Sequence, residues 1–215
     1  MDVSRKQKRR TRQTRQTQQR KTRRKQHGGK TQIHRSAAFI DMLVYLREFT
    51  LDAPFELCGT ITKEKIPPTR PGEQSQSEYV AYVHELTPPL NNDERPHCIY
   101  ERTKDYVIWH NHPRTSKFYP SREDIVKGLK PHSRHISESY IFCEFGIWKI
   151  QYWDHTEVTE EEMKQVKRSL DTLYHQSGRG RVYNQKTDDA VSQMMRTIYT
   201  IFGSRLTIHF LGTDY

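Results

Sequence analysis

The residues best suited to chemistry gather in one stretch, WHNHPRTSKFYPSRED, which runs from Trp109 to Asp124. His110 and His112 are separated by one residue, so a β-strand would project both imidazoles to the same side. At that spacing both rings can reach one ion at the roughly 2.0–2.1 Å of a zinc–nitrogen bond. Pro113 ends the strand, and the loop after it leads to a helix start where Asp124 can supply a carboxylate oxygen. Two histidines, one aspartate and a water are typical of an open, catalytic zinc site.

Each of these residues also has an ordinary structural interpretation. The chain contains 11 histidines, so a pair at a strand end would prove little by itself. Ser121 and Asp124 have the spacing of a helix-capping pair, and for those two residues alone capping is the better interpretation. The whole pattern H-x-H-P-x7-S-x-x-D, however, should arise by chance on the order of once in ten thousand such chains. The combination therefore favours a metal site.

The same stretch resembles the signature of the JAMM (MPN+/JAB) family of zinc metalloproteases. HNHP, a spacer of seven residues and then SRED fit that signature throughout. Asn111 stands where the family usually has Ser or Thr, and this position is not a ligand. The resemblance covers roughly residues 36–155. It implies that the zinc ligands are His110, His112 and Asp124, and that Ser121 hydrogen-bonds the oxyanion formed during hydrolysis.

The family also carries an upstream glutamate in the style Glu-x-x-Gly, on a strand that follows an N-terminal helix. Glu56 and Gly59 fit this pattern here, after a helix predicted over residues 36–50. By resemblance, Glu56 is the general acid/base and acts on water without binding zinc. Glu48 and Glu64 are the alternatives by proximity in the sequence. We expect Glu48 in the helix and Glu64 beyond the strand, which leaves Glu56 as the preferred assignment.

The resemblance further implies a fold and an activity. The implied fold is the α/β/α-type JAB/MPN fold, with a curved mixed sheet flanked by helices and one Zn²⁺ at the sheet edge. The implied activity is hydrolysis of an amide, often the isopeptide between a ubiquitin-like C-terminus and a lysine, so ubiquitin or ubiquitin-like conjugates are the expected partners. Two alternatives stay open: a non-catalytic MPN-type scaffold, and a nucleic-acid-associated protein that acts through a basic tail.

Apolar periodicity predicts the elements independently of any resemblance. The predicted helices cover residues 36–50, 121–129, 160–174 and 188–202, and the predicted strands cover residues 55–61, 79–86, 106–109, 140–144, 147–153 and 206–211. Strands and helices come in runs without regular β-α-β alternation, which favours an α+β fold. We expect one domain over residues 36–215, with the motif core at 36–155 and C-terminal helices and a strand at 156–215.

Residues 1–35 differ in composition from the rest of the chain. They hold 14 of the 36 Lys and Arg residues but only one of the 26 acids, so this segment is basic and the remainder is slightly acidic. It has no aromatic residue and little apolar surface, which predicts a disordered tail hinged at Gly28-Gly29. Residues 5–35 could contact nucleic acid or serve as a nuclear address, or form a solvated arm without a specific partner. This composition resembles that of proteins encoded by large eukaryotic DNA viruses.

Cysteine usage and hydropathy indicate the cellular compartment that we expect for this protein. Cys58, Cys98 and Cys143 form no C-x-x-C pair, and the plain interpretation is a reduced, intracellular protein with small buried thiols, in the cytoplasm or nucleus. No apolar run approaches the ~18 residues of a membrane span, so we expect no membrane partner. The basic N-terminus also lacks the apolar segment of a signal peptide.

Overall fold

The computed structural model describes residues 30–68, 70, 74–84, 86–87, 97–98 and 106–213. The predicted disorder of residues 1–29, with the Gly28-Gly29 hinge, lies outside these ranges. None of the helices within them is long and apolar enough to cross a membrane.

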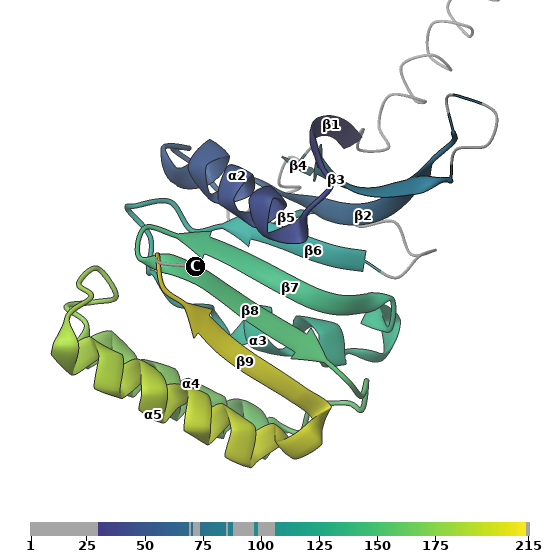
Figure 1. The fold of residues 1–215 in the computed structure, drawn as a ribbon. Coiled ribbons are helices and arrows are strands. Elements are labelled where there is room, and N and C mark those ends of the chain that lie inside the picture. The colour runs from purple at the N-terminus through teal and green to yellow at the C-terminus, as the bar shows by residue number, and fades with distance from the viewer. Residues whose placement is uncertain are drawn as a thin grey trace, which may run out of the picture.

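Seven strands form one mixed sheet in the order β1-β3-β2-β6-β7-β8-β9, drawn as arrows in Figure 1. All neighbouring strands are antiparallel except β6 and β7, which are parallel. The strands are β1 (Lys30–Ser36), β2 (Cys58–Ile66), β3 (Gln76–His84), β6 (Tyr106–Asn111), β7 (Ile136–Cys143), β8 (Gly146–Tyr152) and β9 (Leu206–Leu211). A separate two-stranded ladder pairs β4 (Leu86–Thr87) with β5 (His97–Cys98).

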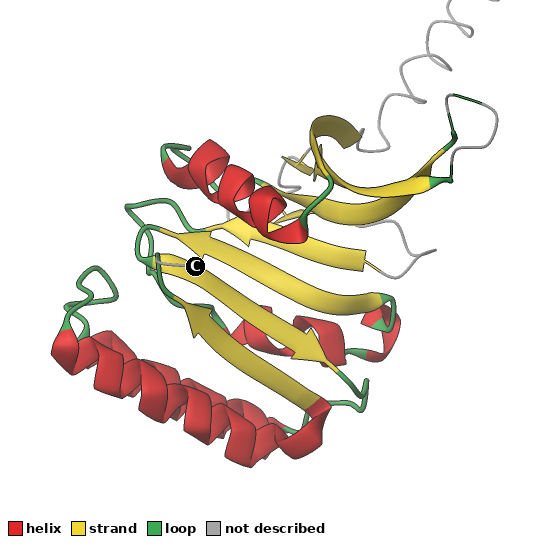
Figure 2. Ribbon diagram, in the orientation of Figure 1, coloured by secondary structure: helices red, strands yellow, loops and turns green. Residues whose placement is uncertain are grey.

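Helices cover both faces of the sheet (Figure 2). One face carries α2 (Phe39–Leu51), and its buried side chains form a cluster that we call the α2 core. The other face carries α3 (Arg122–Val126), α4 (Glu160–Gln176) and α5 (Gln185–Phe202), which form the α3–α5 core. Three short 3-10 turns complete the described elements: Lys127–Leu129, Pro131–Ser133 and Gly203–Arg205.

Strand residues alternate between these two cores, as the pleat of a β-strand requires. On β6, Ile108 packs into the α3–α5 core and Trp109 into the α2 core. The same alternation sends His110 toward α3 and Asn111 toward α2. Because β6 and β7 are parallel, the chain must cross over between them, and α3 lies in that crossover. The crossover brings the start of α3 to the carboxyl end of β6.

The α+β class and most of the predicted elements are confirmed. The last strand has the bounds that the sequence predicts, and the four predicted helices correspond to α2, α3 with its 3-10 extension, α4 and α5. The parallel pairing of β6 and β7 was not predicted, because the order of helices and strands did not indicate a crossover at α3.

Several predicted boundaries differ from the observed ones, and two of the differences have a clear physical reason. The limit of the tail at residue 35 falls inside β1, whose sequence KTQIHRS has one aliphatic residue and pairs only with β3 at the sheet edge. Such a strand has no buried face to impose an apolar alternation. The strand predicted from residue 55 begins at Cys58 instead, because side-chain hydrogen bonds of Asn111 hold the residues before it outside the ladder.

The cysteine interpretation also needs correction. Cys58 is disulfide-bonded, so the expectation of three reduced thiols is wrong for this residue. Cys143 is free and buried, and its Sγ donates a hydrogen bond to the carbonyl oxygen of Gly146 at 3.2 Å. Burial raises the pKa of the Cys143 thiol to about 12, so this residue is a packing group and not a nucleophile.

Candidate metal centre

The two motif histidines lie at the carboxyl end of β6. His110 is the penultimate residue of the strand, and His112 follows its last residue. The backbone N–H of His112 donates to the carbonyl oxygen of Phe142 at 2.7 Å, so the chain keeps its pairing with β7 one residue beyond the strand. Both imidazoles are therefore projected to the same face, toward α3, and both are buried. The structure confirms the strand-end placement predicted from the spacing.

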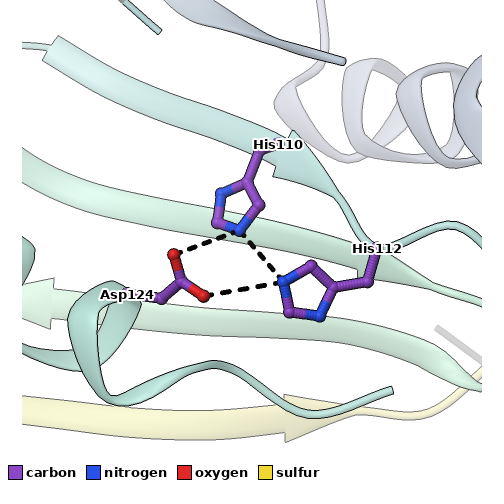
Figure 3. Close-up of side chains that lie close together, drawn as sticks. All are labelled: His110, His112 and Asp124. Atoms are coloured by element: carbon purple, nitrogen blue, oxygen red, sulfur yellow. Dashed lines mark hydrogen bonds and ion pairs between the residues drawn. The ribbon is translucent and has the colours of Figure 1, made fainter. Parts of the chain in front are cut away.

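Asp124 reaches the same point from the first turn of α3. Ser121 is the N-cap: its Oγ accepts a hydrogen bond from the Asp124 N–H at 3.1 Å, and the Asp124 Oδ2 accepts one from the Ser121 N–H at 2.8 Å. The capping interpretation of this pair is thus correct. It does not exclude the metal interpretation, because the cap fixes the carboxylate while leaving it directed toward the histidines (Figure 3).

Three ligand atoms converge between these side chains. The Nε2 of His110 lies 3.3 Å from the Nε2 of His112 and 3.4 Å from the Oδ1 of Asp124, and the His112 Nε2 lies 3.5 Å from the Asp124 Oδ2. Ligands placed tetrahedrally around zinc, with bonds of about 2.0–2.1 Å, stand about 3.3–3.4 Å apart. Each separation matches that ligand spacing, although the two histidines contact different oxygens of the Asp124 carboxylate. One ligand atom from each of the three residues lies within 4.8 Å of the other two. Within the described residues this trio is a group able to hold a metal ion.

Hydrogen bonding fixes which nitrogen of His112 is free to bind a metal. Its Nδ1 lies 2.9 Å from the carbonyl oxygen of Lys117, which can only accept, so Nδ1 carries the proton. The Nε2 then presents a lone pair toward Asp124. A ligating histidine held by a backbone carbonyl at its other nitrogen is the usual arrangement in metal sites. The Nδ1 of His110 is buried without a hydrogen-bond partner among the described residues.

The charges of these three side chains favour a bound cation between them. Burial would raise the pKa of Asp124, but the two imidazoles outweigh it and hold that pKa well below its usual range. Burial would likewise lower the pKa of His112, and the neighbouring carboxylate outweighs it and raises the pKa. A charged carboxylate and two imidazole nitrogens directed at one point repel each other unless a proton or a metal ion lies between them. The donor set therefore fits a divalent ion bound by nitrogen and oxygen.

Glu56 lies in the segment between α2 and β2, not on a strand as predicted. Its side chain is exposed and borders the cavity that contains the three ligand atoms. Its charge contributes, after that of Asp124, to the raised pKa of His112. Glu56 is not part of the metal-ligand group. This placement suits a group that acts on water beside the metal rather than on the metal itself.

The other two glutamates lie elsewhere. Glu48 is exposed on α2, which covers the opposite face of the sheet. Glu64, expected beyond the strand, lies within β2, where it accepts hydrogen bonds from the Tyr82 hydroxyl at 2.5 Å and from the Arg35 guanidinium at 3.3 Å. Neither borders the cavity. Gly59 of the Glu-x-x-Gly pattern has a packing role, because a side chain there would overlap the carbonyl oxygen of Tyr82.

Asn111 holds the Glu56 segment in place. Its side chain is buried on the α2 side of β6, where its Oδ1 accepts from the Leu57 N–H at 2.5 Å and its Nδ2 donates to the Thr50 carbonyl at 3.2 Å. Its own N–H donates to the Leu57 carbonyl at 3.1 Å. The middle residue of His-x-His therefore positions the Glu56 segment, while its neighbours on either side belong to the group able to hold a metal ion. Sequence reasoning passed over this role, although strand alternation places Asn111 on the α2 face.

The cavity is larger than the motif. It has a volume of about 890 Å³ and extends from the candidate metal ligands to the loop between α4 and α5. Lys117, Tyr119, Arg179 and Arg181 border it, and none was singled out from the sequence as a site residue. A run of Gly and Arg between two predicted helices was the available signal. Nearby, desolvation lowers the pKa of Lys127, and the charges of Asp124 and Glu56 oppose that shift.

Comparison of the chain with known proteins adds no relative. No protein-family model matches the sequence, and neither the curated proteins nor the solved structures yield a match. The candidate site consequently rests on its motif and its geometry.

Proposed function

We propose that this chain is a zinc-dependent (iso)peptidase of the JAMM (MPN+/JAB) type, which deconjugates ubiquitin or a ubiquitin-like modifier. The observation that carries the proposal is the convergence of His110, His112 and Asp124, where the two Nε2 atoms lie 3.3 Å apart and each lies 3.4–3.5 Å from an Asp124 carboxylate oxygen. Its support is that a motif matching a family signature folds into the donor arrangement that the signature implies. The sheet with helices on both faces is also compatible with a JAB/MPN-type fold.

His110, His112 and Asp124 would hold the zinc. When bound, the ion would supply the Lewis acidity that polarises an amide carbonyl and makes water acidic near neutral pH. Glu56, exposed at the cavity wall, is positioned to accept a proton from water and pass it to the departing lysine amine.

Ser121 would stabilise the substrate carbonyl oxygen as it gains negative charge. Its Oγ already accepts a hydrogen bond from the Asp124 N–H, so the cap uses a lone pair of the hydroxyl and leaves its proton available. The side chain borders the cavity and is exposed to it. A hydroxyl fixed in this way can donate to the substrate without first reorganising, which is the usual basis of oxyanion stabilisation.

The basic N-terminal segment favours a second candidate function. Its 14 Lys and Arg residues against one acid are typical of a segment that contacts phosphate backbones. Nucleic-acid association through residues 5–35 would accompany hydrolysis, or replace it if the domain is a scaffold. A zinc-free protein that still binds nucleic acid would favour nucleic-acid association in place of hydrolysis.

Hydrolysis of defined conjugates tests the main proposal. The zinc-loaded full chain is incubated with a panel of ubiquitin and ubiquitin-like conjugates, with and without a zinc chelator. We expect release of the modifier from at least one conjugate, loss of that release with chelator, and its return when zinc is restored. Release that persists in chelator would contradict metal-dependent chemistry. A zinc-loaded chain inert on the whole panel would favour the scaffold.

A further inference from the structure

The cavity that contains the metal ligands has a second wall, made by the loop between α4 and α5. Gly178, Arg179 and Arg181 border the cavity from this loop, and Lys117 and Tyr119 border it from the segment between His112 and α3. One continuous space thus joins the metal ligands to residues that the proposed hydrolysis does not use. The question is what these residues would bind.

The loop has a fixed and strained backbone. Gly178, Arg179 and Gly180 have φ values of 55°, 65° and 81°, and Arg179 is the residue other than glycine with positive φ in the described part of the chain. The Gly180 carbonyl accepts a hydrogen bond from the Phe118 N–H at 3.0 Å. A side chain at Gly180 would come within 2.9 Å of the Tyr119 ring. The loop is therefore held against the metal-site segment in a conformation that an arginine adopts at a cost.

Positive charge at this wall is not neutralised. Five cationic side chains border the cavity, and two of them are paired: Arg122 with Glu123 at 2.7 Å and Lys167 with Asp171 at 2.5 Å. Throughout the ranges that the structure describes, no ion pair involves the remaining three, Lys117, Arg179 and Arg181. Arg181 donates one hydrogen bond, to the Thr115 carbonyl oxygen at 3.5 Å. The Nζ of Lys117 lies instead over the rings of Tyr119 and Tyr174, 5.7 Å and 4.9 Å from their centroids.

Tyr119 adds an unused hydrogen-bond donor. The residue is 2% exposed, and its hydroxyl is buried without a partner among the described residues. A buried hydroxyl without a partner is costly, and such groups in folded proteins usually have a function. Burial raises the pKa of Tyr119, so the phenol keeps its proton and can donate. Three cations without a carboxylate partner among the described residues, and one hydroxyl without a hydrogen-bond partner, thus lie along one wall, which is the composition of an anion-binding subsite.

We propose that Lys117, Arg179, Arg181 and the Tyr119 hydroxyl form a subsite for Asp or Glu carboxylates, in an acidic peptide segment next to the scissile amide. The inference rests on the proposed function, because it assigns a substrate class to the same cavity. A peptide is the favoured ligand over a polynucleotide because the subsite shares one cavity with the metal ligands that would act on an amide.

The test compares matched peptides. Fluorogenic isopeptide substrates carry Asp and Glu, or Asn and Gln, at the positions beside the scissile amide, and kcat/KM is measured with the zinc-loaded full chain. The wild type should favour the acidic peptide, and Arg179→Gln/Arg181→Gln should lower that preference roughly tenfold, as expected for two lost charge contacts. Tyr119→Phe should lower it less, without lowering the unfolding temperature, because it removes an unpaired hydroxyl. The control is Arg196→Gln on α5, an exposed arginine that does not border the cavity.

Binding of a non-cleavable acidic peptide to the chelator-treated chain separates the two proposals. Fluorescence anisotropy is compared between the Arg179→Gln/Arg181→Gln variant and the control Arg196→Gln. Both retain the basic N-terminal segment. Weaker peptide binding in Arg179→Gln/Arg181→Gln but not in Arg196→Gln supports the subsite even if no hydrolysis is found. Hydrolysis without acidic preference, or equal binding in all chains, overturns the subsite and leaves the hydrolase intact. Arginine-dependent binding of a single-stranded oligonucleotide, with none of the peptide, would also overturn it.

Discussion

At the scale of single residues, consecutive side chains at the end of β6 lie on opposite faces of the sheet and have different roles. His110 and His112 face α3 and converge with Asp124, while Asn111 between them faces α2 and holds the Glu56 segment. The convergence of His110, His112 and Asp124 could be predicted from sequence because their spacing follows from strand geometry and from the first turn of a helix. The role of Asn111 could not, because its partners Leu57 and Thr50 lie far away in the sequence.

Asn111→Ala should affect both stability and turnover. It leaves the buried Leu57 N–H and Thr50 carbonyl without their side-chain partner, which should cost about 1–3 kcal/mol in the free energy of unfolding. Zinc content should be preserved and kcat should fall, because Glu56 loses its support. Urea unfolding, metal analysis and kcat measure the three effects. Asn111→Ser, the residue type usual in the JAMM family, serves as the milder comparison. An alanine variant with wild-type stability and kcat would refute the positioning role.

Glu56→Gln tests the proposed base. Glutamine keeps the size and polarity of the side chain but cannot accept a proton from water. The variant should fold, keep its zinc and bind substrate, while kcat falls by ~10²–10⁴, the usual contribution of a positioned general base.

Glu48→Gln and Glu64→Gln are the controls, since neither residue borders the cavity. Both should stay within a few-fold of wild-type kcat. Near-normal turnover in Glu56→Gln would show that Glu56 is not the general base. A loss of kcat by ~10²–10⁴ in Glu64→Gln would assign that role to Glu64 instead.

At the scale of elements, strong periodicity made α2, α4, α5, β8 and β9 predictable. β1 was missed because an edge strand with one aliphatic residue looks like part of a polar tail. The β6–β7 crossover was missed because α3 is only five residues long and gives little periodic signal. The loop between α4 and α5 falls between two predicted helices, but its packing against the metal-site segment depends on tertiary contacts that the sequence does not display.

Truncation tests the corrected boundary at β1. Deleting residues 1–29 should leave the unfolding temperature and zinc content unchanged and abolish salt-sensitive binding to nucleic acid. Deleting residues 1–36 should also remove β1 from β3 and the hydrogen bond from the Tyr45 hydroxyl to the Ile33 carbonyl. We expect a loss of about 2 kcal/mol, or about 4–8 °C in unfolding temperature. Equal stability of the two truncated chains would show that β1 contributes nothing to the fold.

The start of α4 gives a prediction for pH. Burial would raise the pKa of Glu162, but hydrogen bonds from Thr159 and the Arg205 guanidinium outweigh it and lower that pKa. A lowered carboxyl pKa stabilises the fold above the unfolded value of about 4.3, and the contribution is lost as pH falls through the folded value.

Glu162→Gln should therefore cost about 1 kcal/mol at pH 7, and its difference from wild type should shrink below about pH 4. Urea unfolding at several pH values measures this. Glu160→Gln, which breaks the exposed pair with Lys164, should cost no more than about 0.5 kcal/mol. A Glu162→Gln deficit that is constant with pH would show that lost packing, and not charge, explains it.

At the scale of the whole molecule, the site forms where three separate parts of the chain meet. β6 supplies the histidines, the crossover helix α3 supplies the aspartate, and the segment after α2 supplies the glutamate from across the sheet. The α4–α5 loop then completes the cavity wall. The two cores, one on each face of the sheet, hold these parts in register. Metal binding at this meeting point is the claim on which the proposed function depends.

Metal content is the most direct measurement of that claim. Elemental analysis of the full chain, purified and dialysed against zinc, should give one zinc per chain. His110→Ala should lose most of it, because three protein ligands leave no redundancy. Asp124→Asn should lose it as well, while its amide oxygen can still cap α3 and preserve the fold, as circular dichroism would verify. A folded wild type without zinc, or full zinc content in both folded variants, would contradict the metal centre at His110, His112 and Asp124.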